Sequence, residues 1–143
     1  MRRNDKYRNQ NDESMTKVRM TNGGCQRSNF DLEERTAKFG EAVIAFAKTV
    51  PVTNVTSPLI PQLVRAGTSV GANYVEADDA DSRKDFRFKI GLCRREAREA
   101  KHWLRMIVAA EMRLGGVVRT LWKEANELNL IFGAIRRKME QKV

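Results

Sequence analysis

Apolar residues recur at steps of three, four or seven along most of the chain, which is the spacing of an amphipathic helix. Four segments show this pattern: residues 29–50, about 60–77, 83–114, and a segment after Gly116 that reaches about residue 139. No segment alternates apolar and polar residues as a half-buried strand does. The sequence therefore predicts an all-α fold, an antiparallel up-down four-helix bundle. The predicted core positions are Leu32, Phe39, Val43, Phe46, Val50, Ile60, Leu63, Val70, Tyr74, Val118, Leu121, Ala125, Leu128, Phe132, Ile135 and Met139.

Recognisable signals mark the helix boundaries. Pro51 ends the first helix because proline cannot continue the helical hydrogen bonds. Ser82 and Asp85 resemble a capping box, with Asp in place of the usual Glu or Gln, and they mark the start of the third helix. The Gly pair at 115–116 is expected to break that helix after about Leu114.

Gly67 and Gly71 lie four residues apart in the second segment and so share one side of the helix. Each glycine costs roughly 1 kcal/mol against alanine inside a helix. Their placement favours a neighbouring helix that approaches closely, although simple tolerance of glycine is the alternative.

The first 28 residues are polar and charged, with almost no large apolar side chain. Such a segment buries too little surface to offset its ordering entropy, so we expect a disordered basic tail over 1–28 and one bundle domain over 29–143. The two cysteines, Cys25 and Cys93, form no disulfide framework, and no run reaches the roughly 20 apolar residues of a membrane span. These features favour a cytoplasmic protein.

The third predicted helix has apolar residues on two nearly opposite sides of a helical wheel. A four-helix core covers only one side, so the other needs a cover, and we expect a second copy of the chain to supply it. The core side carries Phe86, Ile90, Cys93, Ala97, Leu104 and Ile107, and the predicted oligomer interface carries Phe88, Leu92, Trp103 and Met106, with Ala110 beside them.

A basic stripe lies between these two sides. Lysine and arginine outnumber aspartate and glutamate 27 to 18 in the chain, a formal net charge of +9. Like charges one or two turns apart repel unless an anion balances them, and a phosphate backbone would do so. An ordinary solvated helix face, partly neutralised by nearby glutamates, is the alternative. The stripe comprises Arg83, Arg87, Arg94, Arg98, Lys101 and Arg105.

Signals for catalysis are weak. Glu99 and His102 have the Glu-x-x-His spacing of di-iron bundles, but such a centre needs a second copy of the motif and His102 is the only histidine. Cys93 lies among core positions and reads as a small hydrophobe. We therefore predict no enzyme, no metal and no cofactor.

A strip of polar residues follows the second segment. Arg65, Ser69, Asn73 and Glu76 project within about 80° of one another on the wheel. They are expected to form a hydrogen-bonded, charge-paired strip that fixes helix register. Any buried charge in it must be paired, because an isolated buried charge is costly.

Residues 65–107, RAGTSVGANYVEADDADSRKDFRFKIGLCRREAREAKHWLRMI, resemble the four-helix-bundle proteins encoded within intervening sequences of bacterial 23S ribosomal RNA genes. That family includes the accessory variability determinant of diversity-generating retroelements. Its pattern of Arg-Ala followed by Ser, Asn and Glu matches Arg65, Ala66, Ser69, Asn73 and Glu76. The KDF sequence at 84–86 and the EARE and WL residues within 96–104 match one branch of the family.

The resemblance implies a homo-oligomer, in known cases a ring-shaped pentamer with a basic surface, and a nucleic-acid partner without demonstrated catalysis. The retroelement branch adds a reverse transcriptase as a candidate protein partner. We therefore expect a protein that contacts RNA or DNA phosphates through the basic stripe. The alternative is an interaction scaffold or accessory subunit that does not itself contact nucleic acid.

Overall fold

The computed structural model describes residues 24–141, with side chains from Leu32 onward. All of its regular structure in this range is helical, as predicted, and no helix there is long and apolar enough to cross a membrane. The elements are α2 (Gly24–Ala47), α3 (Leu59–Asp78), α4 (Arg83–Ala110), the short 3₁₀ helix η1 (Met112–Leu114) and α5 (Gly115–Gln141).

The first helix begins earlier than its apolar pattern indicates. Helix α2 starts at Gly24, so residues 24–28, which the sequence assigned to the tail, are helical. The rest of the predicted tail, residues 1–23, lies outside the described part of the chain. The start of α4 agrees with its predicted cap, because the Ser82 hydroxyl accepts a hydrogen bond from the Asp85 backbone N–H at 3.0 Å.

The break after the third helix was predicted at the wrong place. Helix α4 ends at Ala110, and the change of direction falls at Glu111, whose backbone is extended (φ −136°, ψ 83°). Gly115 and Gly116 do not interrupt a helix; they form the start of α5, and Gly115 has helical dihedrals (φ −55°, ψ −35°). Glycine is tolerated at a helix end because no complete turn precedes it.

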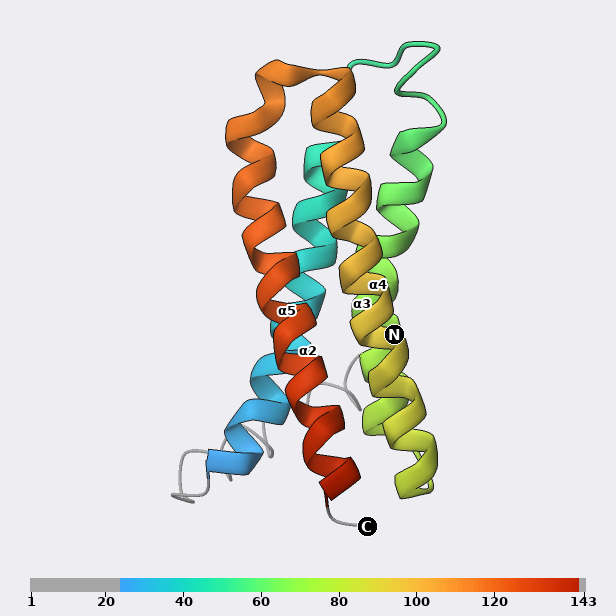
Figure 1. Ribbon diagram of the computed structural model, residues 1–143, viewed down its shortest axis with the longest axis vertical. Helices are drawn as coiled ribbons and strands as arrows, with labels where there is room; N and C mark the ends of the chain where they lie inside the picture. The colour runs from blue at the N-terminus through green and yellow to red at the C-terminus, as the bar shows by residue number, and fades with distance from the viewer. Residues whose placement is uncertain (1–23, 142–143) are drawn as a thin grey trace, which may run out of the picture.

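Helices that follow one another in sequence pack side by side and run antiparallel (Figure 1). Glu76, late in α3, pairs with Lys89, early in α4. Arg87, early in α4, pairs with Glu140 near the end of α5, whereas Lys101 contacts Asn126 in the first half of α5. Helices α2 and α5 contact each other less extensively than do α2 and α3, α3 and α4, or α4 and α5.

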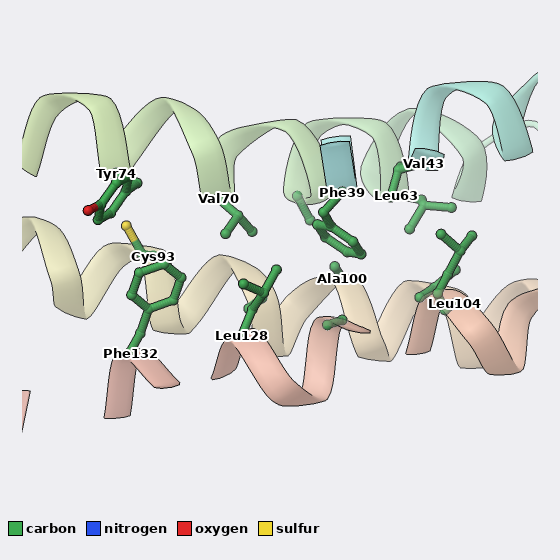
Figure 2. Packing of buried hydrophobic residues seen from close by; sticks show 14 of the residues in the cluster. Phe39, Val43, Leu63, Val70, Tyr74, Cys93, Ala100, Leu104, Leu128 and Phe132 are labelled. Atoms are coloured by element: carbon green, nitrogen blue, oxygen red, sulfur yellow. The ribbon is translucent and has the colours of Figure 1, made fainter. Parts of the chain in front are cut away.

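The core is a single apolar cluster to which α2, α3, α4 and α5 all contribute (Figure 2). Tyr74 and Phe132 meet within it, with ring centroids 5.9 Å apart. Most of the predicted core positions are buried, which confirms the helical phase read from the sequence. Ile60, Phe86 and Ile135 are only partly buried and pack against the edge of the cluster, and Met139 is half-buried and does not belong to it.

The close approach predicted at the glycines of α3 is confirmed at Gly67. A Cβ atom there would lie 2.8 Å from both methyl carbons of Val43 on α2. A Cβ on Gly71 would lie 3.4 Å from the backbone of Thr36, which is ordinary contact. Gly67 therefore sets the spacing of α2 and α3, and tolerance of glycine does not explain it.

Candidate nucleic-acid interface

The predicted basic stripe lies on the side of α4 that faces α5, and part of it is tied to that helix. Arg87 donates a hydrogen bond to Glu140 at 2.7 Å, and Arg83 lies 3.5 Å from the backbone carbonyl of Met139. Lys101 donates to the side-chain oxygen of Asn126 at 2.9 Å, and its ammonium lies 4.8 Å from the centroid of a Trp122 ring. These three cations help to dock α5 on α4.

The other three residues of the stripe are exposed. Within the described part of the chain, the side chains of Arg94, Arg98 and Arg105 have no hydrogen bond or ion pair. With a rise of about 1.5 Å per residue, they extend over roughly 16 Å of α4. They form a row of cations that the protein itself leaves unneutralised.

Helix α5 widens this row in a way that the sequence analysis missed. Gly133 is buried, and a Cβ atom there would lie 3.4 Å from Nη1 of Arg137 and 3.7 Å from Nε of Arg94. The side chains of Arg94 and Arg137 therefore both lie over Gly133, where the helices meet. The signal was present as the Arg-Arg-Lys run at 136–138, but only the packing of α5 on α4 places it beside the stripe.

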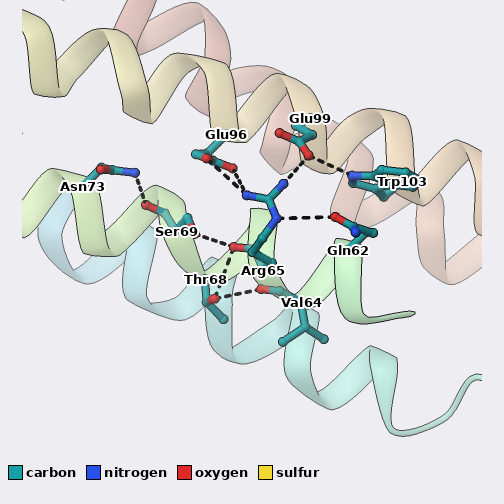
Figure 3. A network of polar contacts seen from close by, with 9 residues as sticks. All are labelled: Gln62, Val64, Arg65, Thr68, Ser69, Asn73, Glu96, Glu99 and Trp103. Atoms are coloured by element: carbon teal, nitrogen blue, oxygen red, sulfur yellow. Dashed lines mark hydrogen bonds and ion pairs between the residues drawn. The ribbon is translucent and has the colours of Figure 1, made fainter. Parts of the chain in front are cut away.

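The side of α4 that faces α3 has a different electrostatic character. Arg65 on α3 pairs with Glu96 at 3.2 Å and with Glu99, both on α4 (Figure 3). The indole N–H of Trp103 also donates to Glu99 at 3.1 Å. This hydrogen bond, together with Arg65, holds the pKa of Glu99 below its usual value, while the hydrogen bond to Glu99 raises the pKa of Arg65.

The remaining residues of the predicted polar strip continue along α3. The Ser69 hydroxyl donates to the carbonyl of Arg65 at 2.5 Å, and the Asn73 amide donates to the carbonyl of Ser69 at 2.9 Å. Glu76 pairs with Lys89 on α4 at 2.6 Å. The charged members of the strip thus pair with α4 and not with each other, so the strip joins two helices. We call this contact, with Arg65, Glu76, Lys89, Glu96 and Glu99, the α3–α4 seam.

The predicted oligomer interface does not form one uniform surface. Phe88 is 60% exposed, and it lines a surface hollow together with the half-buried Leu92. Trp103 lies eleven residues beyond Leu92. Its side chain is partly buried against the core of its own chain, so the side of α4 that carries it is already covered in part. Met106 is half-buried. No partner chain is present, and the interface itself stays a prediction.

The side chains considered for catalysis have ordinary structural environments. Burial raises the pKa of the Cys93 thiol to about 12, so this side chain is neutral and packs as a small hydrophobe. His102 is exposed, and its ring lies edge-on to Trp103 with centroids 5.0 Å apart. Glu99 is occupied by Arg65 and Trp103, as described above.

Comparison with known proteins identifies the family. A family model described as 23S rRNA-intervening sequence protein matches residues 28–134, about three quarters of the chain. The chain belongs to this family. The resemblance inferred from residues 65–107 is therefore confirmed, and the match extends over all four long helices. A comparison with curated proteins gives no match.

A solved structure of the same kind supports the assignment. It is a protein of unknown function from the S23 ribosomal protein family of Bacteroides thetaiotaomicron, with 25% sequence identity and a TM-score of 0.69. The similarity covers 76% of this chain and 97% of that chain. The family model thus identifies the family, and the solved structure supports the fold.

Proposed function

We propose that this family member is a non-enzymatic, cytoplasmic nucleic-acid-binding protein. In this proposal an up-down four-helix bundle assembles into a homo-oligomeric ring, with a pentamer expected, and binds RNA or DNA through phosphate contacts. The row of exposed, unpaired guanidinium groups on α4, at Arg94, Arg98 and Arg105, carries the proposal. The family description, which refers to 23S rRNA, favours RNA as the nucleic acid.

The chemistry of these residues fits a phosphate backbone better than base recognition. Arginine presents a planar set of donors that matches phosphate oxygens, and it remains charged at any physiological pH. Neighbouring like charges on one helix face repel each other, and an anionic strand relieves that repulsion. Binding of this kind fixes the position of the strand but does not read its sequence.

The test is a titration of labelled RNA, followed by fluorescence anisotropy over a range of salt concentrations. The triple variant Arg94→Glu, Arg98→Glu, Arg105→Glu should weaken binding more than about tenfold at low salt. Each single-strand phosphate contact contributes about 0.7 to the slope of log affinity against log salt, so losing three should reduce the slope by about 2. Lys101 is left intact because it packs on Trp122 and Asn126.

A matched control reverses three basic residues outside the stripe: Lys48, Arg119 and Lys123, all exposed and without an ion pair in the described part of the chain. It changes the net charge by the same amount and should leave most of the affinity intact. Equal loss in the two triple variants would show attraction by net charge alone. A stripe variant that binds RNA like the wild type would sink the proposal.

The proposed assembly is supported by apolar groups on the second side of α4. Met106 and Ala110 are half-buried near the end of the helix, and neither is among the residues packed against the core cluster. A surface of this kind is more typical of an interface between subunits than of a solvated face.

An interaction scaffold is the second candidate, and a groove between α2 and α5 favours it. The groove has a volume of about 930 Å³ and an apolar floor that includes Phe39, Ala42 and Leu121. Arg35 crosses from α2 to Glu124 on α5 at 2.6 Å beside it. Such a groove suits a helix of a protein partner, such as a reverse transcriptase in the retroelement branch. Absence of RNA binding at low salt, with the fold intact, would favour this candidate.

A further inference from the structure

A second cationic feature adjoins the stripe near the start of α4 and shares Arg87 with it. A surface hollow of about 460 Å³ opens between α4 and the end of α5, and four basic side chains line it. Its size lies within the range of small-ligand pockets, roughly 300–1,000 Å³. The basic side chains are Lys84, Arg87, Arg95 and Arg136.

The protein neutralises these charges only in part. Glu140 accepts from Arg87 at 2.7 Å and lies 3.8 Å from Nε of Arg136, so one carboxylate serves two guanidinium groups. Nε of Arg136 is buried and, within the described part of the chain, has no hydrogen-bond acceptor. Because buried donors are almost always satisfied, Arg136 has hydrogen-bonding capacity that the described part of the chain does not use.

The hollow also contains an exposed aromatic ring. Phe88 is 60% exposed and lies at the hollow with the half-buried Leu92. The floor includes Gly91, where a Cβ atom would lie 3.6 Å from Nη1 of Arg136. Because Gly91 has no side chain, the guanidinium group of Arg136 lies directly over the backbone of α4. An exposed aromatic side chain and several cations thus share one small cavity.

We infer that this hollow binds one nucleotide of a single-stranded nucleic acid, with its base stacked on Phe88 and its phosphate held by Arg87, Arg95 and Arg136. Aromatic side chains stack on unpaired bases of any sequence, and cations beside them hold the backbone. A base within a duplex is already stacked and does not offer its face. The inference rests on the proposed function and specifies an unpaired strand as its substrate.

Charge decides between this ligand and a second copy of the chain, for which Phe88 and Leu92 were predicted as interface residues. The chain carries a net charge of +9, and a symmetric contact here would bring two sets of four cations together. Like charges placed opposite each other oppose association. A polyanionic strand removes this repulsion. The second copy is nonetheless an outcome that the experiment below detects.

The first test replaces Phe88 by alanine and by leucine and compares single-stranded RNA with a duplex of equal length. Leucine keeps the apolar character but has no aromatic face. Stacking contributes about 1–3 kcal/mol per base, which corresponds to about five- to a hundredfold in affinity. Both variants should therefore bind single-stranded RNA about tenfold more weakly, while duplex binding is unchanged. An RNA that carries 2-aminopurine should change its fluorescence on binding the wild type, and much less with Phe88→Leu.

The outcomes separate the inference from the proposed function. If the wild type binds no RNA, the proposed function fails. If it binds with the expected salt dependence and Phe88→Leu binds equally well, only the inference fails. If the Phe88 variants instead reduce the mass of the assembly in light scattering and leave RNA affinity per subunit unchanged, Phe88 belongs to an interface and the inference is overturned.

A second variant tests the phosphate part of the inference, and this one is expected to strengthen RNA binding. Glu140→Gln removes the carboxylate that occupies Arg87 and Arg136, so single-stranded RNA should bind severalfold more tightly. The control is Glu41→Gln, an exposed position on α2 that alters net charge equally. An equal gain in both variants, or no gain at Glu140, would contradict a phosphate site at these arginines.

Discussion

Helix α4 has charged residues on two sides, and the two sides are organised differently. Toward α3, its carboxylates and Lys89 each face an opposite charge, as in the contacts of Arg65 with Glu96 and Glu99. Toward α5 and solvent, Arg94 and Arg98 face no carboxylate in the described part of the chain. The same helix therefore carries one matched side and one side on which part of the stripe is unmatched.

The difference indicates different roles. Opposite charges on adjacent antiparallel helices favour one register, because a shift by one turn breaks at least one contact of Arg65 and leaves Glu76 without Lys89. Unmatched cations give no such structural benefit and repel each other. An anionic partner from outside the chain would relieve that repulsion, which is the physical basis for proposing a nucleic acid on the α5 side.

The largest expected effect comes from breaking the matched side. Arg65→Glu places three carboxylates together and removes the donor to Glu99. Removing one member of a buried pair costs about 3–5 kcal/mol, and the Arg65 side chain is 46% exposed, so solvent reduces the expected loss to about 2 kcal/mol. Urea unfolding followed by circular dichroism measures it, and the RNA affinity of the folded protein should change little.

The matched control is the same reversal on the other side, Arg98→Glu, which should alter the free energy of unfolding by less than about 0.5 kcal/mol. The compensated double variant Arg65→Glu with Glu99→Arg should recover part of the loss. If Arg65→Glu and Arg98→Glu proved equally stable, the two sides of α4 would not differ and the comparison would be wrong.

The sequence was sufficient for most of the fold because helical periodicity reports burial directly. Positions such as Val43, Leu63, Ile90 and Leu128 repeat at helical spacing, and all are buried. The exit from α4 was missed because nothing in the side chain of Glu111 marks it as a helix end. Its extended backbone directly precedes η1 and so belongs to the turn between α4 and α5.

Helical periodicity predicted only part of the arrangement of the candidate site. A helical wheel groups the residues of one helix, so it found the stripe on α4 and the strip on α3. It does not tell which neighbouring helix a given charge meets, and so it did not assign Glu76 to Lys89. The wheel also could not predict that Arg136 lies near Gly91 and Phe88. Gly91 and Arg136 are 45 positions apart in sequence, and only tertiary packing places them together.

An intermediate effect is expected where the matched side meets the proposed subunit interface. Trp103→Phe keeps an aromatic ring against the core but removes the N–H that donates to Glu99, so unfolding should become about 1 kcal/mol easier. The mass of the assembly should not change. Met106→Glu, three residues on, should instead yield smaller species in light scattering while the helical circular dichroism signal is kept.

These two variants separate the seam from the interface. If the Trp103→Phe assembly had a lower mass than the wild type, the indole would belong to the subunit contact predicted from the sequence. A wild-type protein that is monomeric at micromolar concentration would contradict the homo-oligomer itself, whatever the variants do.

The smallest expected effect is a pH dependence specific to the matched side. The hydrogen bond from Trp103 and the pairing with Arg65 lower the pKa of Glu99 below its ordinary value of 4.5. A carboxyl group whose pKa is lower in the folded state contributes stability that is fully present above the unfolded pKa and is lost as pH falls through the folded pKa. Urea midpoints of the wild type and Glu99→Gln should therefore differ by a constant amount above about pH 5 and converge in more acidic solution. Glu41→Gln, on the exposed side of α2, is the reference for removing one carboxylate. A difference that stays flat or widens in acid would mean that Glu99 is not held in its charged form by the seam.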